Sequence, residues 1–288
     1  MECPNCGKFL DTSSGRDYVT CEYCRSKIAV LSYAEELISS IDLTEISKDK
    51  QKWIKNMLAM ASIDMENRNY GDAYTTYEKI LVDQPFIWEA ILNEAICIFW
   101  LGRQDMQHMP RVVTLLQKAD KLSDRNALVQ KAREDIAHNL AVLASKKERY
   151  GSNIRWSMDC FNISKKLVSH DKERDQLIAG YAVACDNEIF DRLHRNLERD
   201  KKNFDPPKSD IETLCELAVL TEGKEEKVLQ NAIMFAGYKL SRSGDKSDLG
   251  RYLDELKSLH DANYRGKSVY QIHFPVMGGP KIVEVGDR

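Results

Sequence analysis

Four of the eight cysteines in this 288-residue chain form two closely spaced pairs near the N-terminus. Two residues separate Cys3 from Cys6 and Cys21 from Cys24, and 14 residues lie between the pairs. Two thiolates at this spacing lie on one tight turn and converge on a single cation, so two such turns supply four sulfurs in a tetrahedron. Zinc suits this arrangement because it has no ligand-field preference, and closed four-sulfur zinc sites are structural. The spacing therefore predicts one structural Zn²⁺ held by these four cysteines.

The first 31 residues resemble the zinc ribbon family, with Val19 just before the second cysteine pair and Ile28 just after it. The resemblance implies a small β domain in which the same four cysteines hold zinc. About thirty residues cannot bury an adequate core, so the metal should supply much of the folding energy. Two unrelated cysteine pairs and a rubredoxin-like iron site are the alternatives. The rubredoxin pattern, however, has Gly where this chain has Arg25.

Motifs for catalysis are missing from the sequence. It has no Walker loop, Rossmann glycine fingerprint, nucleophile elbow or H-E-x-x-H motif. Its six histidines have no paired metal-ligand spacing. The other four cysteines lie far apart on apolar-rich segments and are expected to be buried free thiols: Cys97, Cys160, Cys185 and Cys215. We therefore expect a protein that is not an enzyme.

The composition indicates a globular, helix-rich protein. Charged residues make up 30% of the chain and hydrophobic residues 43%, with only 14 Gly and 7 Pro, which excludes disordered and collagenous chains. No apolar run approaches the roughly 20 residues that span a bilayer. The N-terminus also lacks a basic region followed by an apolar one. We expect a cytoplasmic protein with reduced thiols and no membrane partner.

Long helices are favoured by the absence of proline between Arg111 and Asp205. The spacing of apolar residues predicts helices at 33–40, 48–67, 70–83, 87–101, 110–121, 124–149, 152–169, 172–203, 209–221, 224–241 and 247–262. Ser209 and Glu212 fit a capping box at one of these starts. Short strands are expected at Tyr18–Thr20 and Ile28–Leu31. A hairpin is expected within 269–285, turning at Gly278-Gly279-Pro280.

Residues 54–87 resemble a tetratricopeptide repeat (TPR), a 34-residue unit of two helices. Five residues match its small, large, aromatic and terminating positions: Ala61, Tyr70, Ala73, Tyr77 and Pro85. Asp64 and Ile80 depart from the pattern, and only a partial second unit follows from Trp88. The resemblance implies a concave groove that binds a partner peptide or helix.

These observations predict a mainly α fold. We expect a small β zinc ribbon over 1–31, a TPR-like α-solenoid over 32–268, and a C-terminal hairpin or tail over 269–288. A single repeat cannot bury its own faces, so the helices must stack on their neighbours.

Charge is unevenly distributed along the chain. Residues 110–204 carry 19 basic and 14 acidic side chains, although the whole chain has a net charge of −3. Within this segment a basic stripe of one expected helix is a candidate partner-binding surface: Arg192, Arg195, Arg199 and Lys202. Acidic residues interleave with these four, so the stripe is expected to be a solvated helix face.

The sequence thus favours a zinc-containing adaptor or scaffold that binds partner proteins through its helical surface. The alternative is a nucleic-acid-associated regulator that uses the ribbon together with the basic 110–204 segment. A phosphate-binding surface needs clustered Lys and Arg, and residues 1–31 contain equal numbers of acidic and basic side chains.

Overall fold

The computed structural model describes residues 3, 6, 8–10, 18–29, 47–102, 106–123, 126–147, 152–200, 204–243, 248–273 and 281–285. The chain forms two compact units. The first comprises Met1–Lys146 and Asp159–Asp171, and the second comprises Lys147–Met158 and Lys172–Arg288.

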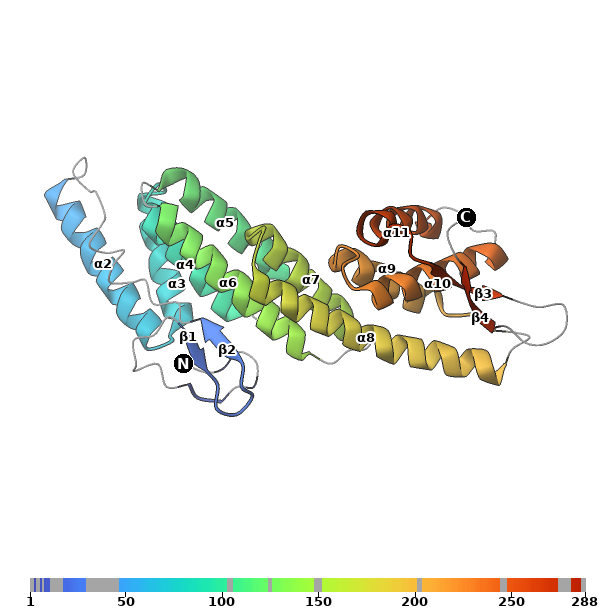
Figure 1. Cartoon of the computed structure of the whole chain (residues 1–288). Helices are drawn as coiled ribbons and strands as arrows, with labels where there is room; N and C mark the ends of the chain where they lie inside the picture. The colour runs from blue at the N-terminus through green and yellow to red at the C-terminus, as the bar shows by residue number, and fades with distance from the viewer. Residues whose placement is uncertain are drawn as a thin grey trace. The chain divides into compact units, whose positions relative to one another are not determined.

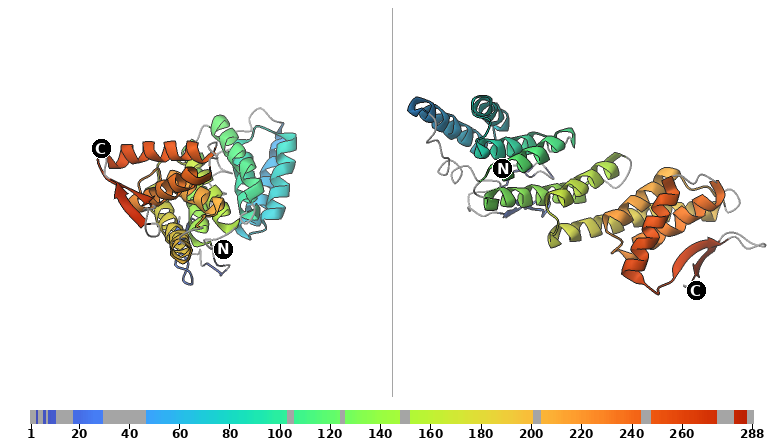
Figure 2. Two further views of the ribbon diagram at one scale, coloured as in Figure 1. Left: turned by 90° about the vertical axis from the view of Figure 1, so that its right-hand side faces the viewer. Right: turned by 90° about the horizontal axis from the view of Figure 1, so that it is seen from above.

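The first unit is a series of helices, each of which packs on the next one in the sequence (Figure 1). Its elements are α2 (Lys48–Glu66), α3 (Tyr70–Asp83), α4 (Trp88–Gly102), the 3₁₀ turn η1 (Met106–His108), α5 (Met109–Leu122) and α6 (Asn126–Lys146). Helix α7 (Ser152–Leu167) contributes its C-terminal part to this unit. The two views of Figure 2 also show α4 and α5 side by side.

Helix α4 lies at the centre of the first unit, since almost all of its residues are buried, whichever face of the helix they are on. Its neighbours approach through small and aromatic side chains. Ala61 on α2 and Ala73 on α3 are fully buried, and the ring of Tyr70 stacks on Trp100 with centroids 5.8 Å apart. The small and aromatic positions expected from residues 54–87 are therefore packing positions.

The N-terminal strands form a two-stranded antiparallel sheet. Strand β1 (Tyr18–Thr20) pairs with β2 (Lys27–Ala29), and Val19 lies opposite Ile28. Both expected strands are confirmed over these residues. Val30 and Leu31, which were expected to extend the second strand, lie outside the described residues.

The second unit contains the C-terminal helices and a hairpin. Its elements are α8 (Lys172–Arg199), α9 (Lys208–Leu220), α10 (Glu226–Ser243), α11 (Asp248–Tyr264), β3 (Val269–His273) and β4 (Lys281–Val285). Strand β3 pairs with β4 and packs on α10. This packing gives the expected hairpin the support that an isolated hairpin lacks. Its expected turn at Gly278-Gly279-Pro280 lies outside the described residues.

Ten of the expected helices are present, with ends that differ by a few residues. The helix expected at 33–40 lies outside the described part of the chain. The expected capping role of Ser209 is wrong, because α9 already begins at Lys208 and has no side-chain cap. The carbonyl of Pro207 instead accepts the first amide hydrogen bonds of this helix.

The fold is mainly α, as expected, with helices packed in neighbouring pairs. Within the described ranges, none of the helices is both long enough and apolar enough to cross a bilayer.

Candidate metal centre

Two tight turns position the four N-terminal cysteines. The amide of Cys3 donates a 2.7 Å hydrogen bond to the carbonyl of Lys8, and the amide of Cys21 donates a 2.9 Å bond to the carbonyl of Ser26. The amide of Arg25 also closes back on the Cys21 carbonyl at 2.8 Å. Each turn therefore directs both cysteines of a pair toward the same point.

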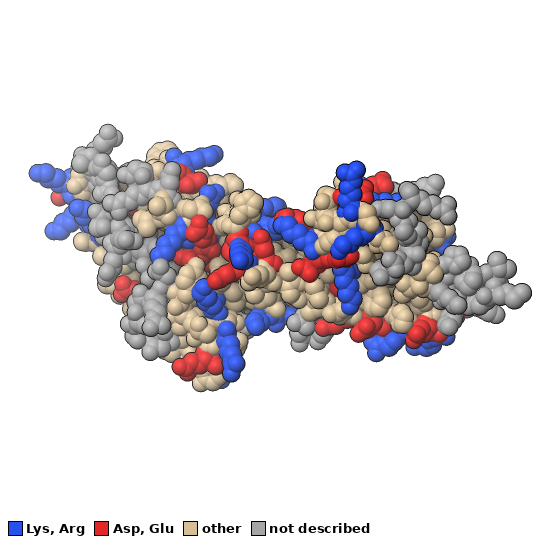
Figure 3. Space-filling model, viewed as in Figure 1, with Lys and Arg blue, Asp and Glu red and all other residues tan. Residues whose placement is uncertain are grey.

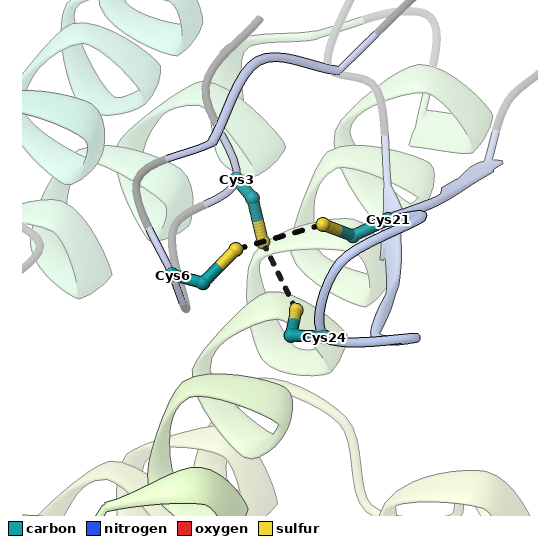
Figure 4. A group of neighbouring side chains, drawn as sticks. All are labelled: Cys3, Cys6, Cys21 and Cys24. Atoms are coloured by element: carbon teal, nitrogen blue, oxygen red, sulfur yellow. Dashed lines mark hydrogen bonds between the residues drawn. The ribbon is translucent and has the colours of Figure 1, made fainter.

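The four sulfur atoms converge on one site (Figure 4). All four lie within 4.8 Å of one another. The distance is 3.5 Å from Cys3 Sγ to Cys24 Sγ and 3.6 Å from Cys6 Sγ to Cys21 Sγ. A tetrahedral Zn²⁺ site with bonds of about 2.3 Å has sulfur atoms roughly 3.8 Å apart. The cysteines that the sequence predicted as ligands therefore fit one tetrahedral metal ion.

The site is closed on one side and open on the other. Cys3 and Cys21 are fully buried, Cys24 is half-buried and Cys6 is exposed. Leu10 is also buried and provides part of a very small core. Among the side chains described in the two turns and strands, Leu10 is the one buried apolar residue besides the cysteines, so the sulfurs are the main groups there that can hold the two turns together.

Arg25 adopts a left-handed backbone conformation with φ of 57°. This is the position directly after Cys24, where the rubredoxin pattern has glycine. A residue with a Cβ atom pays roughly 1–2 kcal/mol to enter this region. Closure of the second cysteine turn imposes this cost.

The ribbon, defined as the cysteine turns with β1 and β2, docks on helix α6. The hydroxyl of Tyr18 donates a 3.2 Å hydrogen bond to Asp135 Oδ1. The imidazole of His138 lies edge-on to the Tyr18 ring, and its Nε2 is 2.9 Å from the carbonyl of Lys27. Asp135 and His138 are 2% and 5% exposed, so these polar contacts are shielded from water. Shielding makes them more costly to break than surface contacts.

A second contact ties the ribbon to the turn between α2 and α3. The guanidinium of Arg68 lies 4.7 Å from the centroid of the Phe9 ring. The ribbon therefore contacts two places of the first unit that are far apart in the sequence.

The sequence did not indicate the docking residues on α6. The spacing of the six histidines bears only on metal binding and gives no sign that His138 forms a hydrogen bond. The sequence offers only a weak signal, which is that Asp135 and His138 are three residues apart and so share one face of the helix. Nothing in that pattern names the ribbon as the surface they meet.

The remaining cysteines lie apart from the metal centre, and all four are buried. Burial raises the pKa of Cys97 and of Cys215 to about 12. Both are therefore protonated thiols at neutral pH. Among the described residues, the N-terminal cluster is the one group of His, Cys, Asp or Glu side chains close enough to hold a metal ion.

The three described arginines of the basic stripe on α8 form hydrogen bonds with nearby residues. Arg192 donates two hydrogen bonds to Asp210, of 3.2 and 2.7 Å. Arg195 donates to the carbonyl of Asp191, and Arg199 to the side chain of Asn196. Lys202 lies outside the described residues.

Acidic and basic side chains are interspersed on the molecular face drawn in Figure 3.

Comparisons of the chain with protein-family models, with curated proteins and with solved structures give no match.

Proposed function

We propose that the chain is a non-enzymatic adaptor, in which a structural zinc ribbon is fixed to a TPR-like helical array that binds partner proteins. One observation carries this proposal. Among the described residues, every exposed large apolar side chain belongs to the first unit. They are Phe9, Tyr23, Trp53, Met60, Ile63, Val82, Phe86, Leu101 and Leu122.

Exposed apolar side chains concentrated on one part of a protein are typical of interaction surfaces. The exposed fraction is 56% for Met60 and 55% for Ile63 on α2, and 73% for Phe86 in the turn before α4. A helical array that presents such residues offers anchors for a partner helix or peptide. The pairing of α2 with α3 and the burial of Tyr77 and Ala73 support the TPR-like part of the proposal.

The metal in this proposal is zinc, and its role is structural. Four cysteines complete a tetrahedral shell and leave no position for a substrate, which favours a structural site over a catalytic one. The protonated thiols of Cys97 and Cys215 support a packing role for those residues. Eight free cysteines suit a reducing compartment, so the proposal includes a cytoplasmic location.

Nucleic-acid binding by the ribbon is a second candidate, and a specific observation favours it. Two exposed aromatic rings of the ribbon each lie beside a cation. The ammonium of Lys8 is 5.5 Å from the centroid of Tyr23, and Arg68 lies over Phe9. Single-stranded nucleic acids bind surfaces that combine stacking rings with basic side chains.

Affinity capture with the full chain tests both candidates. The bait is the zinc-loaded protein, compared with a variant that carries Met60→Ser and Ile63→Ser on the exposed face of α2. If the adaptor proposal is right, the bait should capture a partner protein. The partner should stay bound after nuclease treatment and in high salt, because salt does not screen apolar contacts. The amount captured should fall with the double variant.

Three results would change the assignment. Captured material that disappears after nuclease treatment and raised salt supports the nucleic-acid candidate. Equal capture by both baits would show that the exposed α2 residues are not part of the interface. Elemental analysis that finds iron, or no metal, contradicts the zinc ribbon.

A further inference from the structure

A pocket of about 260 Å³ lies where α3, α4, η1 and α5 meet in the first unit. Its lining residues are Tyr74, Ile98, Leu101, Gly102, His108 and Arg111. None of them belongs to the cysteine cluster.

The floor of the pocket is apolar. Ile98 is 6% exposed, while Leu101 is 55% exposed and forms an apolar rim. Gly102 lets the His108 side chain lie against α4, because a Cβ atom at this glycine would be only 3.1 Å from His108 Cδ2 and 3.2 Å from its Cβ. The pocket therefore has an aliphatic base and an exposed imidazole at its side.

Flat π-systems make up the rest of the wall. The guanidinium of Arg111 lies 5.6 Å from the centroid of the Tyr74 ring. Its Nη2 donates a 2.5 Å hydrogen bond to Glu94, whose side chain is 5% exposed. This ion pair holds the guanidinium in place before any ligand arrives. Phenol, guanidinium and imidazole planes all favour stacking with an aromatic ring.

The charge around the pocket favours a basic neighbour for that ring. Glu78 is half exposed, accepts a 2.9 Å hydrogen bond from the Tyr74 hydroxyl, and lies 3.9 Å from Arg111. Burial raises the pKa of the Glu94 carboxyl, while Arg111 and Lys118 both favour its charged form. Glu94 therefore has two cations near it, whereas Glu78 shares only Arg111 with it. A cation of the partner beside Glu78 would be attracted to this less closely matched carboxylate, whereas an added carboxylate there would be repelled.

We propose that this pocket receives an aromatic side chain of a partner protein, with a Lys or Arg next to it in the partner's sequence. The proposal rests on the adaptor function and names the residue chemistry of its partner. A ring in a pocket of this kind is typical of the anchors that dominate protein interfaces.

Defined peptides test the proposal without a captured partner. Methyl-labelled full chain, loaded with zinc, is titrated with acetyl-Lys-Trp-Lys-amide and followed by NMR. Shifts of the Leu101 and Ile98 methyl groups are expected, with a Kd on the order of millimolar for so small a ligand. Acetyl-Lys-Ala-Lys-amide and acetyl-Glu-Trp-Glu-amide should each bind at least about tenfold more weakly, since the first lacks the ring and the second reverses the charge.

Leu101→Ser is the test variant, and Ile63→Ser is its matched control. Both residues are aliphatic, helical and 55% exposed, but only Leu101 lines the pocket. Both variants should melt as the wild type does, because neither side chain is part of the core. Leu101→Ser should abolish the peptide response and Ile63→Ser should preserve it.

Several outcomes would overturn the proposal. These are equal responses to the Trp and Ala peptides, shifts confined to residues outside the pocket, or unchanged binding by Leu101→Ser. A stronger response to adenosine than to the Trp peptide would also reject a protein side chain as the occupant. Absence of a captured partner together with intact peptide binding would count against the adaptor function alone.

Discussion

Arg25 shows how a single residue carries the cost of closing the metal site. Its backbone lies in the left-handed region, which glycine adopts readily because it has no Cβ atom and in which other residues are strained. Arg25→Gly should therefore stabilise the ribbon by about 0.5–1 kcal/mol, after allowing for the greater freedom of glycine in the unfolded chain. Competition with a zinc chelator measures the gain as a tighter apparent affinity.

The control for this variant is Glu22→Gly in the same turn. Glu22 is not among the residues with positive φ, so glycine there brings only its entropic cost of roughly 0.5–1 kcal/mol. If both variants weaken zinc binding equally, the left-handed conformation of Arg25 carries no cost.

Asp186 makes the second unit sensitive to pH. It is fully buried on α8, and the side-chain amide of Asn231 on α10 donates to both of its oxygens, at 3.1 and 2.8 Å. Burial raises the pKa of Asp186 to about 6, although the amide favours the charged form. The folded state thus holds this proton more tightly than the unfolded state does. The protonated Asp186 therefore contributes its full stabilisation at a pH below the pKa that it has in the unfolded chain. This stabilisation is lost as the pH rises through about 6, the pKa in the folded state.

Asp186→Asn removes this titration and retains one hydrogen bond to Asn231. The free energy of unfolding of the variant minus that of wild type should increase by roughly 2 kcal/mol when the pH is raised from 4 to 7.5. Urea denaturation at both pH values measures the change. Asp254→Asn, at an exposed position of α11, is the control and should show little change. A constant difference between variant and wild type across this range would show that Asp186 does not titrate there.

At the scale of elements, the contact between β1 and α6 joins the candidate metal site to a helical core. Tyr18→Phe keeps the aromatic ring beside His138 but removes the donor to the buried Asp135. Loss of this bond should lower the free energy of unfolding of the first unit by about 1–3 kcal/mol, because a buried carboxylate loses one of its hydrogen bonds away from water.

Tyr23→Phe is the matched control for this contact. Tyr23 also lies in the ribbon, but its side chain is 69% exposed. Removal of its hydroxyl group should therefore change the free energy of unfolding very little. Equal stability of the two variants would show that the Tyr18 hydrogen bond adds nothing to docking.

At the scale of the whole molecule, metal removal should affect the two units differently. Chelation of the metal should unfold the ribbon and expose Asp135 and His138, so α6 should lose protection against amide hydrogen exchange. Helix α10 belongs to the other unit and should keep its protection. Mass spectrometry of peptides from both helices checks this difference. Equal loss of protection in α6 and α10 would show that the metal stabilises the entire chain.

Much of the secondary structure follows from local sequence. The spacing of apolar residues predicted α3 at its observed ends, Tyr70 and Asp83. Strand β4 was likewise predicted over Lys281–Val285. Local periodicity suffices here because each element buries one face, and that face repeats with the period of the helix or strand. The four cysteines that could hold a metal ion were equally local, since each pair lies on its own turn.

Contacts between distant residues could not be read from these patterns. His138 meets the carbonyl of Lys27 across 111 residues, and Tyr74 meets Arg111 across two intervening elements. A polar residue in an apolar helix stripe shows only that it will be buried, not which surface it will meet. By itself, the sequence determined ten of the helices, the strands and the four cysteines that could hold a metal ion. The tertiary structure decided where the ribbon docks and where the pocket forms, because both depend on which helix faces pack together.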